Sequence, residues 1–194
     1  MQLVGSQTSP YVRRIRLYTE GKPVEFVNVS IMTPEGRDAL REYTPIMKVP
    51  VLVAQDLTLF DSRQIHRYLA TTFNDAPLSW EQENLLTLID AVNDSLVTLF
   101  ISFRSGINID EPDLLIAKLQ KERIGQTMHV LNDEAERGAF DEWHYPSIAL
   151  YCLLDWAVFR GLLDLEPYAA LLRFYETHRT HEHLKESDPR LADA

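Results

Sequence analysis

The stretch that decides the fold runs from residue 44 to residue 73 and reads TPIMKVPVLVAQDLTLFDSRQIHRYLATTF. Two apolar runs, Val51–Val53 and Leu57–Phe60, flank the polar tripeptide Ala54-Gln55-Asp56, which has the length of a hairpin turn. From Asp61 onward the apolar residues recur at helical spacing. The stretch therefore predicts a β-hairpin that is followed directly by a helix.

The residues before this hairpin alternate strand and helix signals. Short apolar strands are predicted at 2–6 and 24–31, and helices at 10–21 and 35–42. The order β-α-β-α-β-β-α describes a compact α/β domain over residues 1–75, with a parallel first part closed by the antiparallel hairpin.

A polar linker that contains a proline, residues 74–80, leads into a half of different character. Apolar residues at helical spacing predict four helices, which lie within 80–105, 111–138, 146–161 and 167–179. Residues 80–194 should therefore form an all-α helical bundle. The single cysteine, Cys152, lies in the third of these segments and is expected to be a buried structural thiol.

Composition excludes several classes of partner. The net charge of −10 is concentrated in the second half, where residues 76–194 hold ten Lys/Arg against twenty-one Asp/Glu. Such a surface repels phosphate, so neither nucleic acid nor an anionic membrane is an expected partner. The start MQLVGS lacks the pattern of a signal peptide, and we expect a cytoplasmic protein.

Metal binding is not expected either. One cysteine cannot make a disulfide within the chain or a cysteine-rich zinc site. The histidines His178, His181 and His183 are predicted to belong to a solvated tail rather than to a ligand set.

The first candidate site residue is Ser9, which is followed by Pro10 at the predicted start of a helix. A serine there caps free backbone N–H groups, and proline suits the first helical position. The helix start also favours an anion such as a thiolate, to which a serine hydroxyl could donate a hydrogen bond worth about 1.5–3 kcal/mol. Both readings, a cap alone and a cap that binds substrate, are open, and Ser6 and Thr8 offer rival hydroxyls.

Two further constellations lie in the opening stretch. A cis bond between Val49 and Pro50 would turn the chain and leave the Val49 backbone ready to pair with an extended ligand, although trans is the commoner isomer. Asp61 and Ser62 stand where a strand meets a helix, so N–H groups there could take a carboxylate while Asp61 balances an ammonium. Both residues are also ordinary helix caps.

Taken in order, SQTSPYVRRIRL, TPIMKVPVLV and LFDSRQIHRYL resemble the catalytic loop, the cis-proline loop and the γ-glutamyl site of the glutathione transferase superfamily. The resemblance covers nearly the whole chain. It implies a thioredoxin-like N-terminal domain, a helical C-terminal domain, and a cytosolic homodimer that binds glutathione as a co-substrate for detoxifying an electrophilic small molecule.

The resemblance also implies residue roles. Ser9 matches the position that faces the glutathione sulfur. Lys48 matches the position whose side chain reaches the glycine carboxylate. Val49, ahead of a cis Pro50, matches the residue whose backbone pairs with the cysteinyl part. The pair that binds the γ-glutamyl end corresponds to Asp61 and Ser62.

Serine at position 9 directs the expected chemistry. Family members with cysteine there tend towards disulfide exchange, whereas those with serine or tyrosine stabilise a glutathione thiolate that attacks an electrophile. Cys152 cannot substitute, because it lies in the helical half. We therefore expect conjugation or peroxide chemistry and disfavour a disulfide reductase.

Two positions depart from the family pattern. The family usually has glycine where Met47 stands, and a Ser/Thr cap with an aspartate three residues later where this chain has Ser147 and Leu150. Ser147 is still expected to cap its helix.

An acceptor pocket for the electrophile could be lined by Tyr11, Phe100, Phe103 and Arg104. For the two phenylalanines, core or dimer packing of the long helix is the favoured alternative. The rival function is a non-catalytic protein of the same fold, similar to the stringent-starvation proteins, that serves as a protein-interaction module.

Overall fold

The computed structural model describes residues 1–192, without the side chain of His183, and its contacts divide the chain into two compact units. The first unit is Met1–Leu78 together with the chain from His181 onward, and the second is Ser79–Thr180. The sequence-based division grouped the last residues with the helical part, whereas the contacts group them with the first unit.

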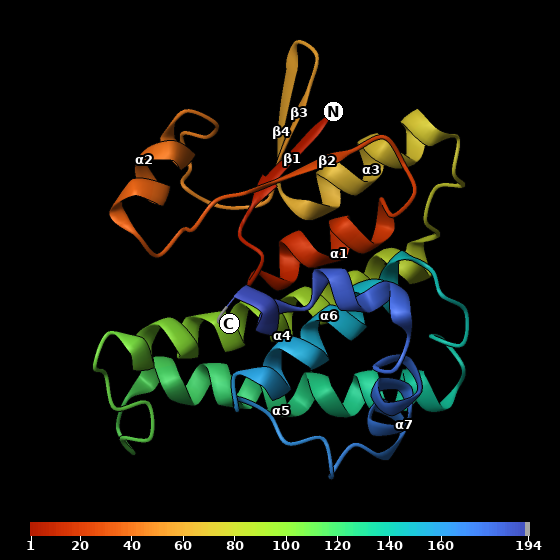
Figure 1. The fold of residues 1–194 in the computed structure, drawn as a ribbon. Coiled ribbons are helices and arrows are strands. Elements are labelled where there is room, and N and C mark those ends of the chain that lie inside the picture. The colour runs from red at the N-terminus through yellow and green to blue at the C-terminus, as the bar shows by residue number, and fades with distance from the viewer. Residues whose placement is uncertain (193–194) are drawn as a thin grey trace. The chain divides into compact units, whose positions relative to one another are not determined.

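The first unit contains a four-stranded sheet in the order β2-β1-β3-β4 (Figure 1). Strands β1 and β2 are parallel, and β3 is antiparallel to both β1 and β4. The strand and helix bounds are β1 Gln2–Gly5, α1 Pro10–Tyr18, β2 Glu25–Asn28, α2 Pro34–Arg41, β3 Val51–Ala54, β4 Leu57–Phe60 and α3 Ser62–Phe73. This is the thioredoxin-like α/β arrangement that the sequence predicts.

Both faces of the sheet are buried because successive side chains of a strand point to opposite faces. Val4 and Val51 are paired across β1 and β3 and pack with Leu40 of α2. Leu3 and Leu52 are the next pair and point the other way, where Leu3 shares a cavity wall with Leu17 of α1. All four strand residues are almost fully buried.

Local sequence sets the helix starts. Ser9 and Thr33 cap α1 and α2, and a proline follows each of them. Gly36 is required in the first turn of α2, because a Cβ there would lie 1.7 Å from the Ser30 carbonyl oxygen. Helix α1 carries the buried apolar pair Val12 and Ile15 towards the core.

The second unit is all helical, as predicted, with bounds α4 Trp80–Arg104, α5 Leu115–Glu136, α6 Tyr145–Phe159 and α7 Ala169–His178. Helix α4 packs against both α5 and α6, and α7 packs against α5 and α6. Cys152 of α6 is completely buried, which confirms a structural thiol.

The expected cap of α6 is wrong. The helix begins at Tyr145 and its N-cap is His144, whose Nδ1 accepts a hydrogen bond from the Ser147 backbone N–H at 3.2 Å. Ser147 is the third helical residue, and its hydroxyl donates to the Glu142 carbonyl at 2.6 Å. Pro146 explains the difference, because proline is favoured in the first turn of a helix. The helix therefore begins before Ser147 rather than after it.

Helix α4 is long and apolar enough to cross a membrane by length and composition alone. A core helix of a water-soluble protein passes the same test, and α4 packs against two neighbouring helices of its own unit. The property therefore does not assign α4 to a membrane.

The last part of the described chain forms two short 3-10 helices, η1 Glu182–Ser187 and η2 Pro189–Ala192. Leu184 and Ser187 are buried, so the chain that follows the three histidines is packed against its unit. Of the three tail histidines, His178 stacks on Trp143 with ring centroids 4.7 Å apart, His181 is exposed, and the side chain of His183 lies outside the described residues.

Candidate functional site

Strand register brings the three predicted loops to one end of the sheet. Val4, Val51 and Phe60 lie side by side on β1, β3 and β4. One residue further along, at the same end of all three strands, stand Gly5, Pro50 and Asp61. Neighbouring strands are about 4.8 Å apart, so the three loops leave the sheet within roughly 10 Å of one another.

Ser9 caps α1 in an ordinary extended conformation with φ −84° and ψ 125°. Its Oγ accepts a hydrogen bond from the Val12 backbone N–H at 3.3 Å. Among the described residues this is its one side-chain hydrogen bond, and Ser9 is an acceptor in it. The hydroxyl proton is therefore left to donate, beside the positive end of the helix dipole.

The rival hydroxyls are engaged with each other. The Oγ of Ser6 and the Oγ1 of Thr8 lie 3.0 Å apart, and Ser6 is buried. The Ser9 backbone N–H donates to the Ser6 carbonyl at 3.0 Å, which folds the loop into a tight turn. This pairing favours Ser9 over its two neighbours as the hydroxyl that meets a ligand.

The peptide bond between Val49 and Pro50 is cis, the isomer that the family resemblance implies. Within the part of the chain that the structure describes, the backbone of Val49 makes no hydrogen bond. An extended ligand could pair with its N–H and C=O. Met47, two residues earlier, has φ +54°, a left-handed conformation that favours glycine.

Asp61 caps α3 through a backbone conformation that non-glycine residues rarely adopt, with φ 71° and ψ 129°. Its Oδ1 accepts hydrogen bonds from the N–H groups of Arg63 at 2.9 Å and Gln64 at 3.3 Å. The carboxylate is exposed, while Ser62 beside it is buried. Among the described residues Oδ2 makes no hydrogen bond, so the exposed carboxylate can still pair with a ligand cation.

Lys48 supplies a cation at the same end of the sheet. Its side chain is exposed, and it makes no ion pair with the residues that the structure describes. An exposed ammonium without a partner in its own unit is suited to a ligand carboxylate.

The residues assigned to an acceptor pocket are placed within their own units. Tyr11 is half-buried under the guanidinium of Arg14, 5.0 Å from the ring centroid. In the second unit, Phe100 packs edge-on against Trp156, with centroids 5.7 Å apart, and Phe103 is exposed. Phe100 therefore has the packing role that was its alternative.

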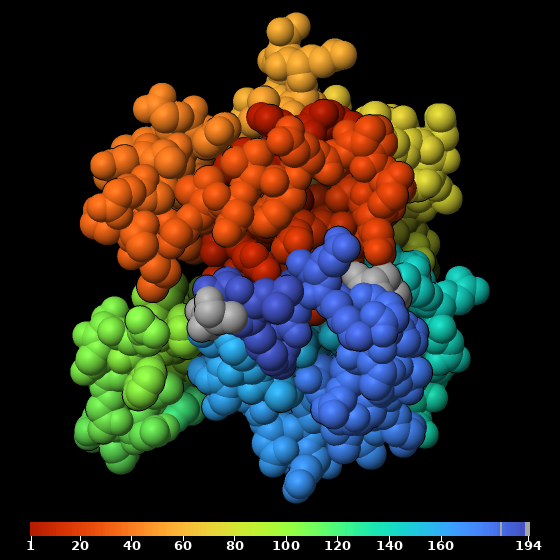
Figure 2. Space-filling view, in the orientation of Figure 1, coloured from red at the N-terminus to blue at the C-terminus, as the bar shows by residue number. Residues whose placement is uncertain are grey.

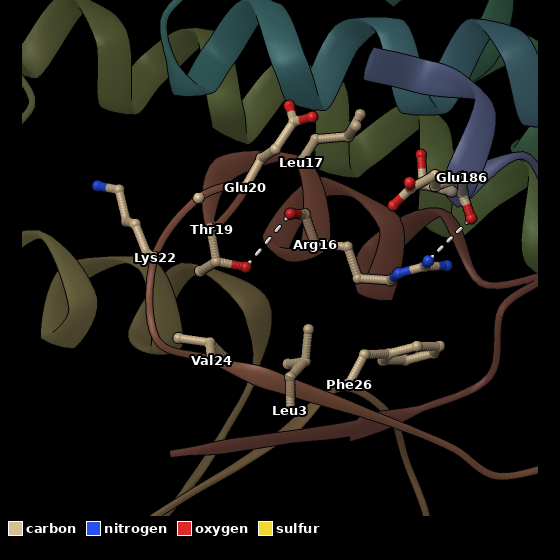
Figure 3. A pocket seen from close by; sticks show the side chains of 11 residues that line it. Leu3, Arg16, Leu17, Thr19, Glu20, Lys22, Val24, Phe26 and Glu186 are labelled. Atoms are coloured by element: carbon tan, nitrogen blue, oxygen red, sulfur yellow. Dashed lines mark hydrogen bonds between the residues drawn. The ribbon is translucent and has the colours of Figure 1, made fainter. Parts of the chain in front are cut away.

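A cavity of about 220 Å³ in the first unit lies away from these loops. It is lined by the last turns of α1, by β2 and by the tail, with Arg16, Phe26 and Glu186 at one end (Figure 3). Ser9, Val49 and Asp61 are not among its lining residues. Among the side chains that the structure describes, which leave out that of His183, no cluster of His, Cys, Asp or Glu could hold a metal ion.

The sequence did not reveal how the first loop is held. Gln7 donates its backbone N–H to Asn28 Oδ1 at 3.0 Å and its side-chain amide to the Asp188 carbonyl at 3.1 Å. Arg13 is buried on α1 and contacts the same tail. Two adjacent arginines, Arg13 and Arg14, on a predicted core helix were the available signal, because a buried guanidinium needs acceptors.

Comparison with known proteins identifies the N-terminal domain and the fold. The model of the glutathione S-transferase N-terminal domain matches residues 3–77, the segment that contains all three loops. A glutathione S-transferase from Methylobacillus flagellatus is 25% identical and superposes with a TM-score of 0.83 over 97% of this chain and 98% of its own. Residues 3–77 therefore form a glutathione S-transferase N-terminal domain, and the chain as a whole has the glutathione S-transferase fold.

Other glutathione S-transferase relatives agree with this assignment. The uncharacterised GST-like protein YibF of Escherichia coli K12 is 29% identical over 172 residues, which is 82% of this chain and 83% of YibF. A glutathione transferase family member from Pseudomonas fluorescens shares the fold, with a TM-score of 0.77 at 20% identity over 97% of this chain and 98% of its own. The structures from Methylobacillus flagellatus and Pseudomonas fluorescens each contain glutathione.

Proposed function

We propose that the protein is a glutathione transferase that binds glutathione along its N-terminal domain and stabilises the thiolate for attack on an electrophilic small molecule. The observation that carries the proposal is the convergence of three loops at one end of the sheet. They offer three complementary groups: a hydroxyl with a proton to donate, a backbone segment without hydrogen bonds, and an exposed carboxylate.

Each group matches one part of glutathione. Lys48 pairs with the glycine carboxylate, and the Val49 backbone pairs with the cysteinyl residue, as an added strand would. At the γ-glutamyl end, Asp61 balances the ammonium, and Ser62 with the start of α3 binds the carboxylate. Relatives whose structures contain glutathione support this assignment.

Catalysis then depends on the thiolate. Donation from Ser9 Oγ–H to the sulfur stabilises the charged form by about 1.5–3 kcal/mol, which lowers the thiol pKa by roughly one to two units. The sulfur forms a bond to an electrophilic carbon, whose leaving group departs with the electron pair of the broken bond. With a hydroperoxide, two glutathiones become a disulfide while the peroxide becomes an alcohol and water.

The proposal includes a domain division at the linker, residues 1–75 for glutathione and residues 80–194 for the helical domain. It also includes a homodimeric assembly and a cytoplasmic location. Tyr11, Phe103 and Arg104 remain its candidates for contact with the electrophile.

Calorimetric titration with glutathione and with S-hexylglutathione tests the proposal. We expect micromolar to millimolar binding that is tighter for the alkyl derivative, because an apolar acceptor site beside the sulfur buries the hexyl chain. A matched titration with Asp61→Ala should show weaker binding of both compounds. If the wild-type protein binds neither, the transferase proposal fails and the rival, a protein-interaction module, takes its place.

A further inference from the structure

The tail of the chain is tied to the element that carries Ser9. Three side chains from the first loop and α1 donate hydrogen bonds to backbone carbonyls of the tail: Gln7 to Asp188, Arg13 to Leu184 and Arg16 to Glu186. The bonds measure 3.1, 3.3 and 2.9 Å. In Figure 2 the tail, in dark blue, lies against the surface of the red N-terminal part of its own unit.

The arginine contacts explain why this packing is stable. Arg13 is 2% exposed, and its Nε also donates to Ser187 Oγ at 3.1 Å. Glu186 lies in the last turn of η1, where carbonyls lack partners within the helix, so Arg16 supplies a donor. The Leu184 carbonyl accepts from the Ser187 hydroxyl as well as from Arg13. The bond from Arg16 to the Glu186 carbonyl is drawn in Figure 3, and the Arg16 guanidinium also lies over the Phe26 ring, 4.2 Å from its centroid.

Gln7 is the member of this set that acts on the candidate catalytic loop. It stands two residues before Ser9, and its backbone N–H is held by Asn28 at the end of β2. Its side-chain amide reaches the tail, where the Asp188 carboxylate accepts from the Arg190 backbone N–H at 2.8 Å. The hydrogen bond from Arg190 to Asp188 holds the turn that contains the Asp188 carbonyl. The loop from Ser6 to Ser9 is thus anchored to the sheet on one side and to the tail on the other.

We propose that Gln7 is a positioning residue for Ser9 and that the tail segment Leu184–Asp188 acts as a strap that holds the catalytic loop. The inference rests on the proposed function, because it concerns where the Ser9 hydroxyl meets the thiolate sulfur. A hydrogen bond to a developing charge is effective only within a few tenths of an ångström of its best position, so a loosened loop lowers thiolate stabilisation. Lys48, Val49 and Asp61 are held by other elements, so glutathione affinity should be kept.

The test compares the wild-type protein with Gln7→Glu and with Lys185→Ala. Gln7→Glu keeps the size of the side chain but removes the N–H donor and places a carboxylate against a carbonyl. Lys185→Ala is the matched control, because this exposed tail side chain pairs with the exposed Glu182, at 2.6 Å, and with no other described residue. Two readouts are recorded for each protein: amide hydrogen exchange of residues 6–12 without ligand, and the pKa of bound glutathione from the ultraviolet absorbance of its thiolate.

For Gln7→Glu we expect exchange in residues 6–12 to speed up about three- to tenfold, the range of one lost hydrogen bond. The pKa of the bound thiol should rise by about half a unit to one unit. We expect kcat to fall about three- to tenfold, while KM for glutathione stays unchanged. Lys185→Ala should match the wild type in all of these. A chain that ends after residue 183 should show a larger effect in the same direction.

The strap is overturned if Gln7→Glu exchanges like the wild type. The positioning role is overturned if exchange rises while the thiol pKa and kcat do not change, since Gln7 would then be structural only. If the wild-type protein fails to bind glutathione, the proposed function falls, and the exchange measurement still decides whether the strap exists.

Discussion

Helices α1 and α3 pack side by side. Polar groups at the starts of the two helices stay available to a ligand, whereas polar groups near their other ends bond to one another. At the starts, the Ser9 hydroxyl keeps a proton to donate, and the Asp61 carboxylate is exposed on a strained backbone. At the other ends, Tyr18 and Lys22 both donate to one carboxylate oxygen of Asp75, at 2.5 and 2.6 Å. Tyr18, Lys22 and Asp75 thus have one another as hydrogen-bond partners.

Electrostatics sharpen the contrast. Burial, together with the hydrogen bond to Asp75, raises the pKa of Tyr18 far above its usual range. Hydrogen bonds from Lys22 and Tyr18 lower the pKa of Asp75. The Lys22 ammonium also lies over the rings of Tyr18 and Phe73, 4.4 and 4.7 Å from their centroids. The far ends therefore stabilise the fold, while the starts keep hydrogen-bonding capacity for a ligand.

The largest effect should come from Ser9→Ala. Removing the hydroxyl removes the donor to the thiolate, so kcat should fall by about tenfold or more and the pKa of bound glutathione should rise by roughly one to two units. Glutathione affinity should stay nearly the same, because other loops bind the peptide. Steady-state kinetics and thiolate absorbance measure these quantities.

Thr8→Val is the comparison for Ser9→Ala, since Thr8 pairs with Ser6 in the same loop. It should keep the wild-type thiol pKa. Equal losses of affinity and turnover in Ser9→Ala would mean that Ser9 is only a helix cap.

Asp61 should show the next largest effect, and two variants separate its roles. Asp61→Asn keeps an acceptor for the N–H groups of Arg63 and Gln64 and tolerates positive φ, but loses the charge. Glutathione affinity should fall roughly tenfold while the free energy of unfolding stays within a few tenths of a kcal/mol. Asp61→Ala should lose affinity and also about 1 kcal/mol of stability.

Calorimetry and denaturant unfolding give the two numbers for each Asp61 variant. Unchanged affinity in Asp61→Asn would remove Asp61 from the γ-glutamyl site.

The sequence predicted what depends on local pattern. The element order, the antiparallel hairpin and the four helices of the second half follow from periodicity and turn residues, and the structure confirms them. The sequence placed the three motifs in one α/β unit, and the strand register adds that they share one end of its sheet. The roles of Ser9, Lys48, Val49, Pro50, Asp61 and Ser62 stay predictions.

Other features depend on backbone geometry that residue types do not specify. Met47 and Asp61 have positive φ although neither is a glycine, because the surrounding loops hold them there. At position 47 this conformation gives a physical reason for the glycine that the family usually has there. The packing of residues 184–188 was not predicted, because three of its hydrogen bonds use backbone carbonyls, which leave no pattern in the sequence.

Tyr18→Phe tests the other half of the comparison, at the far ends of the helices. The variant keeps the ring under Lys22 and removes only the hydroxyl that donates to Asp75. It should lower the free energy of unfolding by about 0.5–1 kcal/mol, since the bond is solvent-accessible and its net contribution is modest. Glutathione affinity and thiol pKa should not change. A change in the thiol pKa would show that the two ends of the helices are coupled and do not act independently.

The smallest expected effect is the pH dependence that Asp75 contributes to stability. Its pKa is lower in the folded protein, so its contribution is present above the unfolded value of about 3.9 and is lost as the pH falls through the folded value. Tyr18 has the opposite sign, because its raised pKa gives a contribution that is present below about pH 10 and lost above it. Denaturant unfolding between pH 3 and pH 7 should therefore show a slightly shallower acid loss for Asp75→Asn than for the wild type. Because the Asp75 side chain is 42% exposed, high salt should shrink this difference. Identical acid profiles in low salt would mean that the carboxylate is paired equally well in the unfolded chain.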